Sequence, residues 1–96
     1  MSSSEYHEPV NELSHETRDM HRALMSIMEE FEAIDWYNQR IETCKDEELK
    51  SILIHNRDEE KEHASMMLEW VRRKDKALDE QMKDYLFTDK PITDKG

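Results

Sequence analysis

The feature that most constrains the fold of this chain is the placement of its helix-breaking residues. The two prolines stand at positions 9 and 91 and the only glycine is the last residue, Gly96. About eighty consecutive residues therefore contain neither, and these are the residues that most disfavour the interior of an α-helix. Such a run is typical of long helices, and we predict a nearly all-helical protein.

The first helix is predicted to begin with Pro9 in its first turn and to run to about Thr43. Its apolar stripe steps by four and three residues, the spacing that keeps side chains on one helix face and that coiled-coil packing seams share. The stripe consists of Leu13, Thr17, Met20, Leu24, Ile27, Phe31, Ile34, Asn38 and Ile41.

A second helix is predicted from Glu47 to about Arg73. Asp46 can cap it, because an aspartate before a helix accepts a hydrogen bond from a free amide of the first turn. The short connection before Asp46 implies an antiparallel hairpin. A shorter third helix is expected after a break near Lys74 or Asp75.

The chain is poor in the residues that build a large core. Its 96 residues form at most one domain, 1–96, whose ends (1–7 and 88–96) are predicted to be flexible, and 35% of them are hydrophobic against 40% charged. Chains of this size usually need disulfides, metals or oligomerisation. The single cysteine, Cys44, excludes a disulfide within the chain. We therefore expect oligomerisation, a metal, or both.

The acidic balance of the chain bears on its partners. A net charge of −10 argues against nucleic acid, whose binding depends on Lys and Arg. No stretch approaches the roughly eighteen apolar residues of a membrane span. The lone thiol and the polar N-terminus predict a reducing, cytoplasmic location. An acidic surface attracts cations, although the charge alone is also explained by solubility.

Two metal-ligand residues stand at positions where the second helix should be apolar. Its stripe steps by four and three through Leu49, Leu53, Asn56, Glu60, His63, Met67 and Trp70. A buried carboxylate or imidazole without a partner costs several kcal/mol. A divalent cation would satisfy both, and Glu-x-x-His is half of the ligand set of di-iron helical bundles. A hydrogen-bonded pair across a dimer is the alternative.

Glu30 is the residue of the first helix that should face Glu60. It lies about fourteen residues before the turn and Glu60 about sixteen after it, so their heights differ by roughly 3 Å at 1.5 Å per residue. One hairpin then offers Glu30, Glu60 and His63, and two hairpins related by a twofold axis offer the ligands of a two-metal site. We predict such a homodimer, a four-helix bundle with the site at its interface. Tyr37 lies two turns along the same edge.

Several neighbouring residues have a simpler interpretation. Glu12-x-x-His15 has the same spacing as Glu60-x-x-His63 but lies off the seam, which predicts a solvated surface. Periodicity likewise places Glu29 and Glu32 on a solvated face, and Trp36 and Tyr37 could be interface anchors. The seven methionines are expected to serve packing.

Two long motifs make the chain similar to the encapsulated ferritins. They are MEEFEAIDWY at residues 28–37 and HNRDEEKEHA at residues 55–64, and YLFT at 85–88 followed by PIT at 91–93 also fits. The resemblance covers about residues 7–93. It implies a ferritin-like ferroxidase, which oxidises Fe(II) to Fe(III) with dioxygen at a di-iron site between two subunits. By motif position, the ligands would be Glu30, Glu60 and His63 with Tyr37 beside them, while Glu29, Glu32 and Trp36 would form an outer metal-attracting site.

The resemblance also implies partners. These are a homo-oligomer built as a ring of dimers such as a decamer, and an encapsulin shell protein that encloses the stored iron. Family members usually end in a flexible extension with an encapsulin-targeting peptide. The sequence stops at Gly96 without one, so either it is truncated or its loading into a shell is in question.

The ligand types leave the metal and the activity open. Calcium, zinc or manganese could occupy the same residues in place of iron. The rival functions are therefore a non-catalytic, metal-stapled helical scaffold and a divalent-metal buffer.

Overall fold

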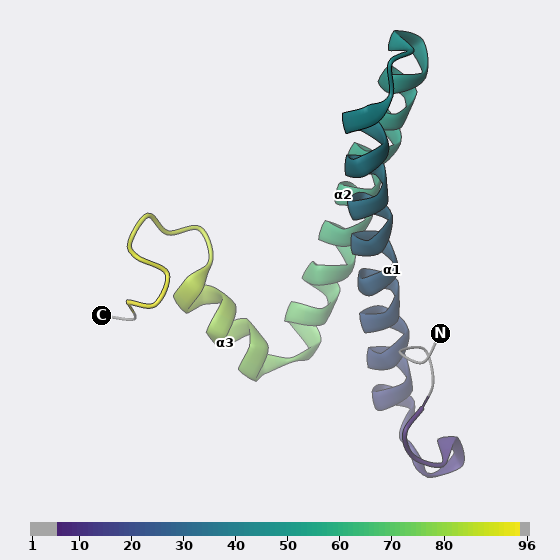
Figure 1. Cartoon of the computed structure of the whole chain (residues 1–96). Coiled ribbons are helices and arrows are strands. Elements are labelled where there is room, and N and C mark those ends of the chain that lie inside the picture. The colour runs from purple at the N-terminus through teal and green to yellow at the C-terminus, as the bar shows by residue number, and fades with distance from the viewer. Residues whose placement is uncertain (1–5, 95–96) are drawn as a thin grey trace.

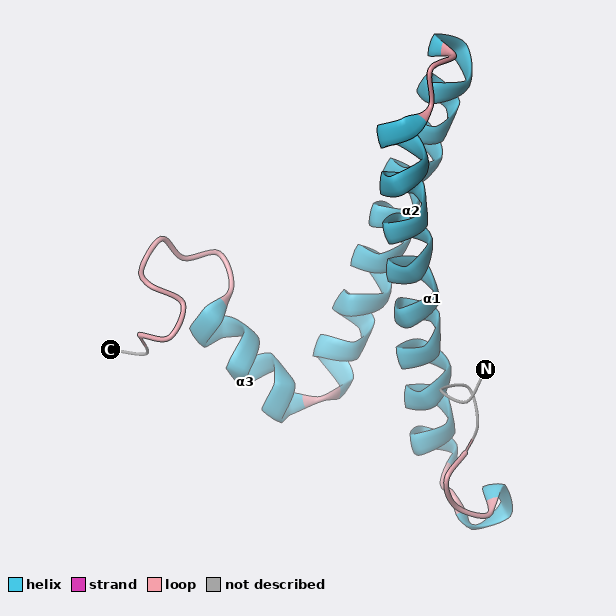
Figure 2. Ribbon diagram, in the orientation of Figure 1, coloured by secondary structure: helices cyan, strands magenta, loops and turns pink. Residues whose placement is uncertain are grey.

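The computed structural model describes residues 6–94 as an all-helical chain (Figure 1, Figure 2). Its elements are a short 3-10 turn η2 (Val10–Glu12) and the helices α1 (His15–Thr43), α2 (Glu47–Lys74) and α3 (Lys76–Tyr85). No strand occurs in this range, and the predicted all-α class is confirmed. Residues 1–5 and 95–96, parts of the ends predicted to be flexible, lie outside the described residues.

Helices α1 and α2 lie side by side as the predicted antiparallel hairpin (Figure 1). α1 ends where the amide of Cys44 donates a 2.9 Å hydrogen bond to the carbonyl of Arg40. After a short connection, the Asp46 carboxylate accepts a 2.8 Å bond from the amide of Leu49 and caps α2. The hairpin therefore turns where the sequence predicted, at the short connection before the Asp46 cap. None of the helices within residues 6–94 combines the length and apolarity that crossing a bilayer requires.

The predicted start of the first helix is wrong. Pro9 precedes η2 instead, and Leu13 adopts an extended conformation that separates this turn from α1. Ser14 then caps α1, since its hydroxyl accepts a 3.1 Å bond from an amide of the first turn. The guanidinium of Arg18 donates to the carbonyl of Val10 at 2.6 and 3.1 Å and ties η2 to α1.

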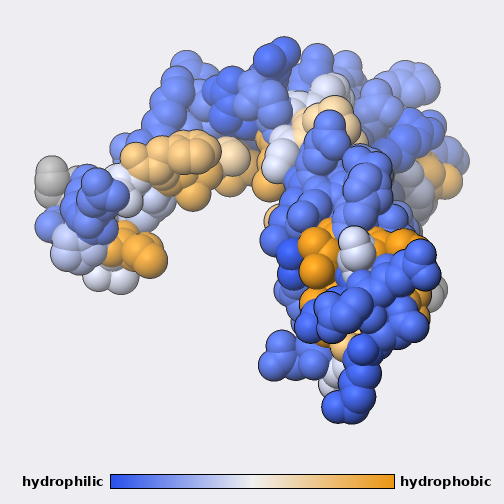
Figure 3. All heavy atoms as spheres, turned by 90° about the horizontal axis from the view of Figure 1, so that it is seen from above, coloured by the Kyte–Doolittle hydropathy of each residue, from blue (hydrophilic) through white to orange (hydrophobic). Residues whose placement is uncertain are grey.

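The core between α1 and α2 is small. The buried apolar residues are Ala23, Ile27, Ile41, Ala64 and Val71. Ala23 and Ile27 of α1 form one buried cluster with Val71 of α2, and Met20 and Met67 pack against it. Two apolar members of the predicted seam behave differently, because Leu24 is 44% exposed and Phe31 50% exposed. Its polar members Thr17 and Asn38 are exposed as well. Figure 3 shows apolar side chains open to solvent between hydrophilic ones on the hairpin. One α2 helix thus covers only part of the apolar surface of α1.

Helix α3 turns away from the hairpin at an elbow beside Asp75 (Figure 1). The amide of Asp75 closes α2 by donating to the carbonyl of Val71 at 2.9 Å. Its carboxylate accepts a 3.0 Å bond from the amide of Leu78 and caps α3. The predicted break is therefore confirmed, and Asp75 both ends α2 and caps the start of α3.

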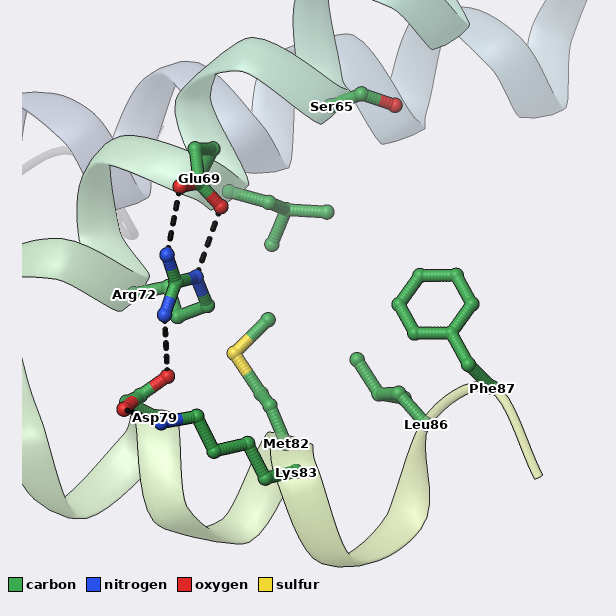
Figure 4. Close-up of a pocket in the computed structure, with 9 residues that line it drawn as sticks. Ser65, Glu69, Arg72, Asp79, Met82, Lys83, Leu86 and Phe87 are labelled. Carbon is green, nitrogen blue, oxygen red and sulfur yellow. Dashed lines mark hydrogen bonds and ion pairs between the residues drawn. The ribbon is translucent and has the colours of Figure 1, made fainter.

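Ion pairs hold the elbow at its angle. The guanidinium of Arg72 binds both carboxylate oxygens of Glu69, at 2.7 and 2.8 Å, and also binds Asp79 on α3 (Figure 4). Next to these pairs, α2 and α3 enclose a groove of about 530 Å³ whose apolar lining includes Leu68, Met82 and Leu86.

These ion pairs predict a pH dependence of the elbow. The hydrogen bonds from Arg72 lower the pKa of Glu69 from 4.5 to about 2, and Arg72 also lowers the pKa of Asp79. Because both pKa values are depressed in the folded chain, the stabilisation is present above pH 4.5 and is lost as the pH falls through about 2. In an NMR titration, the side-chain carboxyl carbon shift of Glu69 is expected to hold until the pH nears 2. In Arg72→Gln the Glu69 shift should move at a higher pH, because only Arg73 then remains paired with this carboxylate. Identical curves for the two proteins would contradict the prediction.

Candidate metal centre

Three side chains converge between the two long helices. α1 supplies Glu30, and α2 supplies Glu60 and His63. One ligand atom from each lies within 4.8 Å of the others, and no other such group of three occurs in residues 6–94. The His63 Nδ1 atom is 3.6 Å from Glu30 Oε2 and 3.6 Å from Glu60 Oε1. The structure thus brings together the three residues that the sequence analysis placed at one height.

The local helical geometry explains this convergence. Glu60 and His63 are three residues apart on α2, so their side chains share one face. Glu30 faces them because the hairpin turns midway between the two positions. The three side chains remain 22%, 24% and 44% exposed for Glu30, Glu60 and His63 respectively. The site is therefore accessible from one side and leaves room for further ligands.

The electrostatics of the group favour a cation. The hydrogen bond with Glu60 is the main cause that raises the pKa of Glu30, followed by partial burial and by the charge of Glu60. His63 opposes this rise. Two carboxylates that share a site resist ionising together, and a positive ion between them would remove that repulsion. The donor set of two carboxylates and one imidazole fits iron, zinc or manganese.

The other predicted site residues lie on α1 outside this group. Glu29 and Glu32 are exposed, and Trp36 is half-exposed. Tyr37 is partly buried, and the guanidinium carbon of Arg40 lies 5.4 Å from the centre of its ring. Their assignment to a metal-attracting site or to the surroundings of the ligands stays a prediction.

The internal control motif behaves as predicted. Glu12 belongs to η2 whereas His15 is the first residue of α1, and both are exposed. Since a break separates them, their spacing does not place them on one helix face. Glu12-x-x-His15 therefore matches Glu60-x-x-His63 in sequence but not in geometry.

One polar contact near the centre escaped the sequence analysis. Arg57 lies on α2 one turn before Glu60, and its Nη1 donates a 3.2 Å hydrogen bond to Oδ1 of Asn38 on α1. The available signal was Asn38 itself, which with Thr17 is one of two polar residues in a stripe that is apolar elsewhere.

Comparisons with known proteins identify the family of this chain. The EncFtn-like family model matches residues 5–89. A Thermotoga maritima protein named ferritin-like protein is 58% identical over 92 residues, which are 96% of this chain and 81% of that protein. The encapsulated ferritin-like protein of Rhodospirillum rubrum is 56% identical over 92 residues, and the chain spans 66% of its length.

A solved structure shows the same fold. The crystal structure of a protein from Nitrosomonas europaea superposes with a TM-score of 0.89 at 67% identity, covering 93% of this chain and 98% of that one. The family model, the relatives and this structure each cover most of the chain, and the resemblance inferred from its motifs is confirmed. The chain therefore belongs to the EncFtn-like family.

Proposed function

We propose that this chain is a ferroxidase that binds ferrous iron through Glu30, Glu60 and His63 and oxidises it with dioxygen. The observation that carries the proposal is the convergence of these three ligand atoms within 4.8 Å in a member of the EncFtn-like family. The names of the relatives, ferritin-like and encapsulated ferritin-like, support iron as the metal.

A second copy of the chain would complete the site. One chain offers three ligand side chains that remain partly open to solvent. Beside Glu30, α1 presents the exposed apolar residues Leu24, Met28 and Phe31, which are unfavourable in water. A twofold partner packed on this stripe would cover it and bring a second Glu30, Glu60 and His63 opposite the first. The resulting four-helix bundle would have the ligand inventory of a di-iron protein.

The proposed chemistry is a balanced transfer of electrons from the iron substrate. Two ferrous ions give two electrons, which with two protons reduce one dioxygen to hydrogen peroxide, while four electrons would give water. Carboxylates are hard oxygen donors that keep their affinity as iron becomes ferric. The neutral imidazole of His63 adds a ligand without adding negative charge. Glu30 and Glu60 would therefore favour the ferric product.

The remaining roles belong to the same proposal. Tyr37 would border the ligands, and Glu29, Glu32 and Trp36 would attract metal at the outer face. The single domain, residues 1–96, would assemble into a ring of dimers inside an encapsulin compartment of the cytoplasm. The name of the Rhodospirillum rubrum relative, encapsulated ferritin-like protein, supports this location.

Oxygen consumption after addition of ferrous iron at near-neutral pH tests the proposal. We expect uptake well above that of a protein-free blank, together with stoichiometric formation of ferric iron. Blank-like uptake with tight metal binding would contradict it. The centre would then be the metal staple of a structural scaffold or a zinc or manganese buffer, since its ligands also fit those ions.

A further inference from the structure

Arg57 links the two long helices beside the candidate metal centre. Its Nη1 donates a 3.2 Å hydrogen bond to Oδ1 of Asn38 on α1, and its Nε lies 3.2 Å from the carboxylate of Asp58. Only 23% of the Arg57 side chain is exposed, so most of it is enclosed by the hairpin. The contact with Asn38 therefore bridges α1 and α2 at a partly covered position.

The location of this contact matters for the ligands. Arg57 precedes Glu60 by three residues on α2, which is roughly 5 Å along the axis. On α1, Asn38 follows Glu30 by eight residues, so the contact lies between the centre and the hairpin turn. A slip of one helix by one turn, about 5.4 Å, would carry Glu30 away from Glu60 and His63.

The apolar core alone gives weak protection against such a slip. It consists of a few buried residues, two of which are alanines. Hydrophobic contact is non-directional. Its free energy therefore changes little when a shifted helix places one apolar residue of a stripe where another stood. A hydrogen bond requires a particular partner at a particular distance, so the contact between Arg57 and Asn38 fits one register of the two helices better than a register shifted by one turn.

We propose that Arg57 is a positioning residue, whose hydrogen bond to Asn38 holds α1 and α2 in the register that places Glu30 opposite Glu60 and His63. The inference rests on the proposed metal-binding role of these three residues. It assigns Arg57 an indirect effect, because the charged groups that act on the Glu30 carboxyl are Glu60 and His63.

Cobalt(II) binding to the full chain provides the test, because its affinity and absorption spectrum report on ligand geometry without any turnover. We expect Arg57→Met and Asn38→Ala each to lower cobalt affinity by roughly tenfold or more, as removal of partners behind metal ligands commonly does. The double variant should lose no more than either single one, since all three lack the same contact. Arg57→Lys, which keeps a donor, should recover part of the loss and the native spectrum.

Arg22→Met is the matched control. Arg22 is an exposed arginine of α1 that pairs with Asp19 on the same helix, so its loss should leave cobalt affinity unchanged. Thermal unfolding of the metal-free variants separates positioning from general stability. Asn38 is exposed, and Asn38→Ala is expected to keep the native unfolding temperature while losing affinity.

Native cobalt affinity in both Arg57→Met and Asn38→Ala would overturn the inference, as would additive losses in the double variant. These outcomes leave the proposed activity intact. Conversely, a native chain that binds cobalt but consumes no oxygen with iron would refute the ferroxidase proposal, while the cobalt series would still decide the role of Arg57.

Discussion

Replacing Glu60 by alanine is expected to lower the rate of oxygen-dependent iron oxidation by at least about a hundredfold, to that of a protein-free blank. Loss even of the groups behind metal ligands costs about ten- to a hundredfold, and Glu60 is itself a proposed ligand. The variant should still fold. Glu60 raises the pKa of Glu30 mainly through a side-chain hydrogen bond and also through its charge, so its removal takes one negative charge from this group in the metal-free chain. Oxygen consumption and thermal unfolding, measured on the same samples, separate the two effects.

Glu12→Ala and His15→Ala are the matched controls for this experiment. They remove the same residue types at the same spacing, from exposed positions that do not share a helix face. Both should oxidise iron at the native rate. Oxidation that persists in Glu60→Ala, or metal occupancy that is unchanged by it, would show that the proposed ligand set is wrong.

Divalent metal is expected to convert the chain from monomer to dimer. Without metal, the carboxylates of Glu30 and Glu60 repel each other within a chain, and a twofold partner would add two more. A cation that binds only the dimer stabilises it by mass action, by about 2.7 kcal/mol at a hundredfold excess over its dissociation constant. This corresponds to a roughly hundredfold tighter dimer. Sedimentation velocity with and without ferrous iron or cobalt, under anaerobic conditions, measures the change.

The variant Phe31→Asp tests the predicted dimer in a second way, by placing a charge in its proposed interface. Phe31 is 50% exposed on the apolar stripe of α1 and is not a proposed ligand. A charge there should block dimerisation and iron oxidation together, because a buried unpaired carboxylate is costly. Ile92→Asp places the same charge on the exposed C-terminal segment and should change neither. A chain that stays monomeric with metal, yet oxidises iron rapidly, would show that one copy suffices.

Local chemistry explains why most of the fold could be predicted. The long run without glycine or proline indicated helices, and Asp46 marked where the second helix begins because its carboxylate caps a free amide. For the third helix the sequence indicated only a break near Lys74 or Asp75, and the structure shows Asp75 as its cap. The same reasoning failed at Pro9. Proline is compatible with the start of either a 3-10 turn or an α-helix. In the structure Pro9 precedes η2, and α1 begins later, after its cap Ser14.

The candidate site was predictable for a geometric reason. In an antiparallel hairpin, residues equally distant from the turn lie at the same height, and this placed Glu30 beside Glu60 and His63. The contact between Arg57 and Asn38 was not predictable in the same way. A long arginine side chain can reach several partners. Which of them it contacts depends on how the two helices are rotated against each other and on which side chains are buried between them.

The sequence by itself determined the three helices, their ends except the start of α1, the hairpin and the three residues that meet within it. These follow from backbone preferences and helix periodicity, which act over a few residues. Only the tertiary structure decided that Ala23, Ile27 and Val71 form one buried cluster, that Leu24 and Phe31 stay exposed, and that α3 turns away at the Arg72 ion pairs. Those outcomes depend on how two helix surfaces fit together, because burial is a property of a pair of surfaces and not of either stripe alone.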